Sequence, residues 1–303
     1  MAFTSFLTLL FSIVLQLPSS QSAHPIRVIE VPSYSEGIVF DHAGNAFFSH
    51  GKFVTRLKPD GTSGIWAETG APDGHKILAD DSHLICDDHG AIFQLDKNGK
   101  LIRKITEADG KPLRAPNDLT LDPEGGFYFT DPGDSGEKPT GSVGYVDANW
   151  HAHIIAGGLR YSNGIVLRPG GKVLLVGESK RNHVLEYPVL AAGKVGPPKV
   201  FATLPSKGPG QIGNQPDGMC LDADGNLYIA HYGMGRVQVV DSRGKLIRSY
   251  RTGLLTTSNV AFGGTRMDQL YVTGGIGEEG KSPGGLFRLD LPGVRGLTIL
   301  PSR

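Results

Sequence analysis

Residues Asp217–Gly233 read DGMCLDADGNLYIAHYG, a pattern that recurs along the chain and decides its fold. A polar and a small residue precede an apolar run, a tight Asp-x-x-Gly turn and a second apolar run with an aromatic residue. Such a turn is typical of a β-hairpin, because Asp accepts local backbone hydrogen bonds and Gly tolerates positive φ. The stretch therefore predicts two antiparallel, largely buried strands.

Six copies of this hairpin pattern occur along the chain. Successive copies start 39 to 54 residues apart, and further strand candidates follow each hairpin. Four strands in a unit of about 40–50 residues is typical of a propeller blade. No stretch shows helical 3.6-residue periodicity over more than two turns. The sequence therefore predicts an all-β fold, a six-bladed β-propeller, with repeats that start at Glu36, His75, Asn117, Asn163, Asp217 and Ser258.

The two ends of a propeller have to meet, because closing the ring removes an open sheet edge. The strand candidate Ile26–Val31 precedes the first repeat, and we expect it to be the outer strand of the sixth blade. The C-terminal strand candidate Leu297–Leu300 is a rival for the same place.

Residues 1–23 differ in kind from the rest of the chain. The apolar run Phe6–Leu17 is followed by Pro18 and by small residues up to Ala23. This run is shorter than the roughly 20 residues that a membrane span needs, so a secretory signal is favoured over a membrane anchor. We therefore expect a signal peptide, 1–23, and a propeller domain, 24–303. The mature chain is expected to be secreted or periplasmic, with no membrane attachment.

Charge and cysteine content exclude two other classes of protein. The chain has 30 Lys and Arg against 30 Asp and Glu and no basic run, so we expect no nucleic-acid partner. Cys86 and Cys220 lie far apart in strand-like apolar runs. Two cysteines do not make a disulfide scaffold, and we expect both to be buried free thiols, although an exported protein could pair them.

The first residue of each repeat has a special place in a propeller. Innermost strands run along the central channel, so the six equivalent residues should lie at one height around it. All six are polar, and four of them carry carboxylate or amide oxygens, which suit a hard cation such as Ca²⁺. Two carboxylates in a narrow channel also repel each other unless a cation neutralises them. The alternative is that each residue caps a strand or turn.

Several strings carry a family resemblance: YSEG (Tyr34–Gly37), PNDLTLDPEGGFYFTDPG (Pro116–Gly133), YSNGI (Tyr161–Ile165) and QPDGMCLDADGNLYIAHYGMGRV (Gln215–Val237). The chain resembles the SMP-30 (senescence-marker-protein-30)/gluconolactonase family over almost all of its mature length. The resemblance implies a six-bladed propeller of the lactonase and related hydrolase kind, with a divalent metal in the channel. The expected ion is Ca²⁺, with Zn²⁺, Mn²⁺ and Mg²⁺ as alternatives.

The resemblance also implies the roles of particular residues. Glu36, Asn163 and Asp217 are expected to bind the metal, and Asp217 is expected to be the catalytic acid/base as well. Asn117 is expected beside them, as a further ligand or in contact with the substrate.

Two further residues are candidates for substrate binding. Some family members carry a substrate-binding Arg two residues before the channel Asn, whereas Arg114 lies three residues before Asn117. That departure leaves the role of Arg114 open. His75 is expected to line the channel.

These expectations define a small-molecule hydrolase. The favoured reaction is metal-dependent hydrolysis of a lactone, either a sugar lactone such as gluconolactone or a similar small cyclic ester. The same metal could serve an arylesterase or a phosphotriesterase. A non-catalytic ligand-binding propeller is the third possibility. The Gly- and Pro-rich segments Pro132–Gly141 and Pro205–Gln215 are expected to cover the channel mouth and set specificity.

Overall fold

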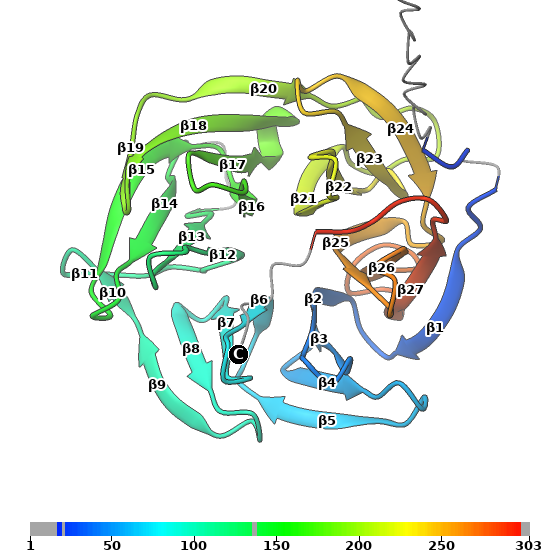
Figure 1. Cartoon of the computed structure of the whole chain (residues 1–303), viewed down its shortest axis with the longest axis horizontal. Helices are drawn as coiled ribbons and strands as arrows, with labels where there is room; N and C mark the ends of the chain where they lie inside the picture. Colours follow the sequence, from blue (N-terminus) through cyan, green and yellow to red (C-terminus); the bar gives the residue numbers. More distant parts are fainter. Residues whose placement is uncertain (1–16, 20–21, 135–137, 298–303) are drawn as a thin grey trace, which may run out of the picture.

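The computed structural model describes residues 17–19, 22–134 and 138–297. Within these ranges, six antiparallel sheets are arranged as blades around a central axis (Figure 1). The predicted all-β, six-bladed propeller is confirmed. A single short 3₁₀ helix, η1 (Ser179–Arg181), is the one helical element of the described residues. None of the described helical structure is long and apolar enough to cross a membrane.

Each blade runs from an innermost strand at the channel to an outer strand at the perimeter (Figure 1). The innermost strands are β2 (Ser35–Phe40), β6 (Pro72–Ile77), β12 (Leu119–Leu121), β16 (Ser162–Leu167), β21 (Gln215–Leu221) and β25 (Thr256–Gly263). The second strands are β3 (Ala46–His50), β7 (His83–Asp87), β13 (Phe127–Asp131), β17 (Val173–Glu178), β22 (Leu227–Tyr232) and β26 (Gln269–Gly275). The third strands are β4 (Phe53–Leu57), β8 (Ala91–Leu95), β14 (Gly141–Val146), β18 (His183–Ala191), β23 (Arg236–Val240) and β27 (Gly284–Asp290).

The perimeter holds the outer strands and two small additions. The outer strands are β5 (Ser63–Glu68), β9 (Leu101–Ile105), β15 (Ala152–Leu159), β20 (Lys199–Thr203), β24 (Leu246–Arg251) and β1 (Ile26–Val31). The fourth blade also carries β19 (Lys194–Val195), and β10 (Glu107–Ala108) pairs with β11 (Lys111–Pro112) as a separate ribbon.

The N-terminal strand closes the ring. β1 pairs antiparallel with β27, with Ile26 opposite Arg288 and Val31 opposite Gly284, so the expected closure is confirmed. Of the rival C-terminal strand, Leu297 donates a backbone hydrogen bond to the fifth blade, and residues 298–300 lie outside the described ranges. Residues 1–16 and 20–21 of the expected signal peptide lie outside them too.

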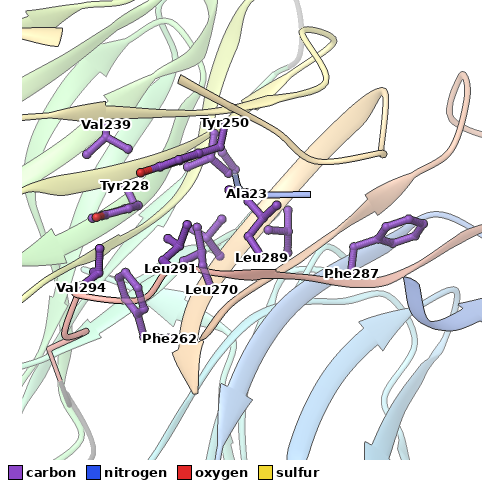
Figure 2. Packing of buried hydrophobic residues seen from close by; sticks show 14 of the residues in the cluster. Ala23, Tyr228, Val239, Tyr250, Phe262, Leu270, Phe287, Leu289, Leu291 and Val294 are labelled. Carbon is purple, nitrogen blue, oxygen red and sulfur yellow. The ribbon is translucent and has the colours of Figure 1, made fainter. Parts of the chain in front are cut away.

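The core is divided among the contacts between neighbouring blades. Among the described residues, six clusters of buried apolar side chains each join adjacent blades. Figure 2 shows the cluster between the fifth and sixth blades, where Tyr228 and Val239 face Phe262 and Leu270. The rings of Tyr228 and Phe262 meet edge to face, with centroids 4.9 Å apart. Burying one such side chain contributes about 1.5–3 kcal/mol, so each blade depends on both neighbours.

The two cysteines are free, as the sequence predicts. Cys86 is buried in the second blade, whereas Cys220 on β21 is half-buried.

The innermost strands approach one another closely around the channel. A Cβ on Gly164 would lie 2.1 Å from the carbonyl oxygen of Asp217, and one on Gly218 would lie 2.3 Å from the Cγ atom of Asn259. Glycine at these two positions therefore permits the close approach of β16, β21 and β25. The same approach brings the residues just before the glycines, Asn163 and Asp217, next to each other.

A buried histidine should make the stability of the propeller depend on pH. The His83 ring lies 4.5 Å from the Phe47 ring and 4.3 Å from the Trp66 ring, between centroids, and burial lowers the pKa of His83 to about 3. Between that value and the ordinary 6.5, the unfolded chain binds a proton that the folded chain does not, so stability is lost as the pH falls. From pH 7 to pH 5 this loss amounts to about 2 kcal/mol.

The test is urea unfolding of the wild type and of His83→Phe at pH 7 and at pH 5. We expect the variant to lose about 2 kcal/mol less than the wild type over this interval. An equal loss in both proteins would contradict the assignment to His83.

Candidate functional site

In five of the six blades, the pairing of the innermost strand has an irregular step near its start. The pairing of β16 with β17 jumps between Ser162 and Ile165, which leaves Asn163 within a β-bulge. The pairing of β21 with β22 jumps directly after Pro216, which leaves Asp217 in the same position. A bulge re-aims a side chain out of the regular alternation of a strand. In the first, second, fourth and fifth blades, this step lies at a polar residue that lines the channel cavity.

A cavity of about 720 Å³ opens at this end of the channel. Four of the predicted site residues line it together, and a further residue, which is acidic, joins them. These five are Glu36, Asp73, Asn117, Asn163 and Asp217. Around them, the cavity wall includes Tyr34, Tyr161 and Tyr232, with Asp88, Lys180 and Glu279.

The second repeat has a different register from the one expected. The β6–β7 pairing jumps between Pro72 and His75, and its β21–β22 counterpart jumps between Pro216 and Met219. Asp73 is therefore the equivalent of Asp217 in the ring, and His75 is the equivalent of a core methionine. The triplet Pro-Asp-Gly, which begins at both 72 and 216, is the sequence signal that marks the correct register.

His75 lies away from the cavity. Its side chain is buried and stacks on the ring of His83, with centroids 6.4 Å apart, and it is absent from the described cavity wall. Neither of its ring nitrogens has a hydrogen-bond partner among the described residues. The structure therefore shows His75 in the core between strands, packed against Gly37 and outside the described cavity wall.

Replacing His75 by leucine should stabilise the protein. Leu119 and Ile165 occupy the same position in other blades, and an unsatisfied buried polar group costs about 1–3 kcal/mol. We expect His75→Leu to raise the free energy of unfolding by up to about this amount, measured by urea titration. Its KM in the hydrolysis assay described below should match the wild type. A clear rise in KM would return His75 to the substrate site.

Two other polar residues also face elsewhere. Arg114 forms an ion pair with Asp134 (Nη1 to Oδ1, 2.8 Å), with both side chains more than half exposed. Ser258 donates a hydrogen bond of 2.7 Å from its hydroxyl to the backbone carbonyl of Ser35, which joins the sixth blade to the first. Neither residue belongs to the cavity wall within the described part of the chain.

The segments at the mouth differ in part from those expected. Of Pro205–Gln215, only Gln215 belongs to the described wall, and residues 135–137 of Pro132–Gly141 lie outside the described ranges. The segment 279–283, between β26 and β27, lines the mouth instead. No hairpin pattern marks that segment in the sequence.

The buried acidic groups of the cavity have raised pKa values. Burial raises the pKa of Glu36 to about 8, even though the Tyr34 hydroxyl donates a hydrogen bond of 2.7 Å to its Oε1 atom. Burial, and then the negative charge of Glu36, raise the pKa values of Asp73 and Asp217 as well. These three buried acids repel one another, and a cation between them would relieve that repulsion.

The side chains present fit a cation that prefers oxygen ligands. The Oδ1 atom of Asn163 is buried and accepts no hydrogen bond from any described residue. The other candidate ligands are the carboxylates of Glu36 and Asp217 and the amide of Asn117. All four groups can offer oxygen atoms, which are the ligand atoms that Ca²⁺ prefers. No three acidic, histidine or cysteine side chains of the described ranges form a metal site by themselves. A cation site here would therefore depend on the amide oxygens as well.

Comparison with known proteins adds a sequence relationship. Residues 34–275 match the family model of the SMP-30/Gluconolactonase/LRE-like region. Lactonase drp35 of Staphylococcus aureus (strain MW2) is 37% identical over 156 residues, which cover 51% of this chain and 47% of that protein. Lactonase drp35 of Staphylococcus haemolyticus (strain JCSC1435) is 31% identical over 220 residues, covering 69% and 66%. The match to the first relative thus spans about half of its length.

Solved structures share the fold. A luciferin-regenerating enzyme superposes with a TM-score of 0.76 at 18% identity, over 93% of this chain and 100% of that one. A gluconolactonase from Xanthomonas campestris gives 0.75 at 24% identity, over 89% and 90%. The calcium-binding protein regucalcin from Agrobacterium tumefaciens strain C58 gives 0.75 at 23%, over 93% and 98%. At these identities the likeness establishes the architecture.

Proposed function

The chain belongs to the SMP-30/Gluconolactonase/LRE-like family, and on that premise we propose that it hydrolyses a lactone with the help of one divalent cation. The observation that carries the proposal is the convergence of Glu36, Asn117, Asn163 and Asp217 on one cavity. The unpaired Oδ1 atom of Asn163 supports a cation there. Sequence relatives named lactonase support the reaction, and a structural neighbour named as calcium-binding supports Ca²⁺ as the ion.

The division of labour follows from the chemistry of the side chains. A divalent cation held by Glu36, Asn163 and Asp217 would supply Lewis-acid polarisation of the lactone carbonyl and offset the negative charge that develops on its oxygen. Asn117 would offer its amide oxygen as a further ligand or orient the substrate beside the cation. Asp217 accepts a proton from the attacking water and delivers one to the departing ring oxygen.

The aromatic wall suits a small cyclic ester. Tyr34 and Tyr232 meet edge to face with ring centroids 6.2 Å apart, and both line the cavity. Such rings offer flat apolar faces, while the carboxylates and amides around them offer hydrogen-bond partners for hydroxyl groups. We therefore propose a sugar lactone such as gluconolactone, or a similar small cyclic ester, as the substrate.

We also propose that residues 1–23 direct export of the chain.

The experiment is a panel of lactones, aryl esters and phosphotriesters offered to the purified protein, with Ca²⁺ and with a chelator. We expect lactone hydrolysis that the chelator abolishes and added Ca²⁺ restores. Preferential hydrolysis of an aryl ester or a phosphotriester would reassign the substrate class. No hydrolysis of any compound would leave a ligand-binding propeller.

A further inference from the structure

Asp73 is a buried acid that the family resemblance does not assign to the site. It occupies the second blade's place in the ring, between Glu36 of the first blade and Asn117 of the third, and its residue is only 7% exposed. Burying a carboxylate is costly unless hydrogen bonds and charges compensate for the lost water. The contacts of Asp73 therefore indicate what its carboxylate does.

The neighbouring backbone holds Asn117 in place. Its N–H donates to the carbonyl of Thr130 at 2.9 Å, and its own carbonyl accepts from the N–H of Gly74 at 2.8 Å. With the backbone fixed on both sides, the main remaining freedom of the Asn117 side chain is a flip of its amide. The flip decides whether the oxygen or the NH₂ group faces the cavity.

A hydrogen bond to Asp73 fixes the orientation of this amide. The Nδ2 atom of Asn117 donates to Oδ2 of Asp73 at 2.7 Å, a contact buried between the second and third blades. Asp73 thus accepts through Oδ2, and an amide donates hydrogen bonds only from its NH₂ end. Contact with Asp73 therefore selects the NH₂ end of Asn117 and leaves the Oδ1 atom for other partners.

We propose that Asp73 is a positioning residue, which fixes the Asn117 amide so that its oxygen is presented to the cation and substrate in the cavity. The inference rests on the proposed function, because it requires a cation at this site. Residues that orient a metal ligand in this way typically contribute about 10–100-fold to metal affinity or activity. The proposal places the blade-two residue in the machinery of the site, one contact away from the cation.

The decisive experiment is a double-mutant cycle between the two residues. Calorimetric titration with Ca²⁺ alone gives the affinity of the wild type, Asp73→Ala, Asn117→Ala and the double variant, and the lactone assay gives the KM of each. We expect Asp73→Ala to weaken Ca²⁺ binding or raise KM by about 10–100-fold in the wild-type background. In the Asn117→Ala background the same change should have little further effect, because Asp73 acts through Asn117.

Two more variants separate positioning from charge. Asp73→Asn keeps an oxygen that can accept from Asn117, so it should recover part of what Asp73→Ala loses. Glu279→Gln removes another carboxylate from the cavity wall, one that accepts a hydrogen bond from Tyr232 and not from Asn117, so its effect should be the smaller one. If Glu279→Gln weakens binding as much as Asp73→Ala does, the effect is one of charge and the positioning role is overturned.

The outcomes also separate this proposal from the proposed function. A wild type that binds no Ca²⁺ would overturn the cation site and the positioning role with it. A wild type that binds Ca²⁺, with Asp73→Ala equally harmful in both backgrounds, would overturn the positioning role alone and make Asp73 an independent contributor.

Discussion

Asp217→Asn is expected to lower the turnover number for a lactone by about 10²–10⁴-fold, the usual range for loss of a general acid–base group. The asparagine keeps an oxygen that can face the cation but cannot accept the proton of the attacking water. Metal occupancy should fall much less than turnover. Calorimetric Ca²⁺ titration and steady-state kinetics on the same preparation measure the two quantities separately.

The amount of added Ca²⁺ provides the control for Asp217→Asn. Raising the Ca²⁺ concentration until the variant is saturated should leave most of the loss in turnover in place. If saturation restores wild-type turnover, Asp217 serves only as a ligand, and the proton acceptor lies elsewhere in the cavity.

Glu36→Gln should show the opposite behaviour. In the proposed mechanism Glu36 contributes a charge to the site but takes no part in proton transfer, so its loss should weaken Ca²⁺ binding by about 100-fold or more, as expected for removing one charged ligand. Excess Ca²⁺ should then restore most of the turnover, measured by titrating Ca²⁺ into the lactone assay.

The contrast between these two acids tests the enzymatic interpretation as a whole. Both line the same cavity, and burial raises the pKa of both. If both variants hydrolyse lactones at the wild-type rate without added metal, the channel is not the catalytic site.

The fold was predictable because its signals are local. A hairpin is marked by its own turn, such as Asp222 followed by Gly225, so the number of hairpin patterns in the sequence gives the number of blades. The closing strand Ile26–Val31 was predictable from a physical requirement, because an open edge strand would be exposed.

The site was predictable in part, for the same reason. Asn163 and Asp217 precede a glycine in a repeated pattern, so their place in the ring follows from sequence. Asp73 was missed because His75, two residues further on, is polar where other blades carry an apolar residue. The pattern therefore indicates His75 as the ring residue of the second repeat. The hydrogen bond between Asp73 and Asn117 joins two blades and has no signature in either repeat alone.

The cavity wall needs the tertiary structure. Tyr34, Tyr161 and Tyr232 come from three different blades, and their convergence depends on how the blades are arranged. Tyr161 has a φ of 66°, which side chains of its size rarely adopt, so local preference would not have predicted its backbone. Loops that take their conformation from their neighbours are the part of a propeller that sequence patterns describe least well.

The pairing of β1 with β27 has a consequence for the order of folding. Ile26, among the first residues of the propeller, lies opposite Arg288, among the last, so the sixth blade waits for nearly the whole chain to be synthesised. Contacts between such distant residues form slowly, since the entropy of the intervening loop has to be overcome before they contribute any stability. Until then the five earlier blades have a gap beside them, and both unpaired edges are open to strands of other molecules. Chains truncated before Gly284 lack the third strand of that blade, so they would remain in this association-prone state permanently.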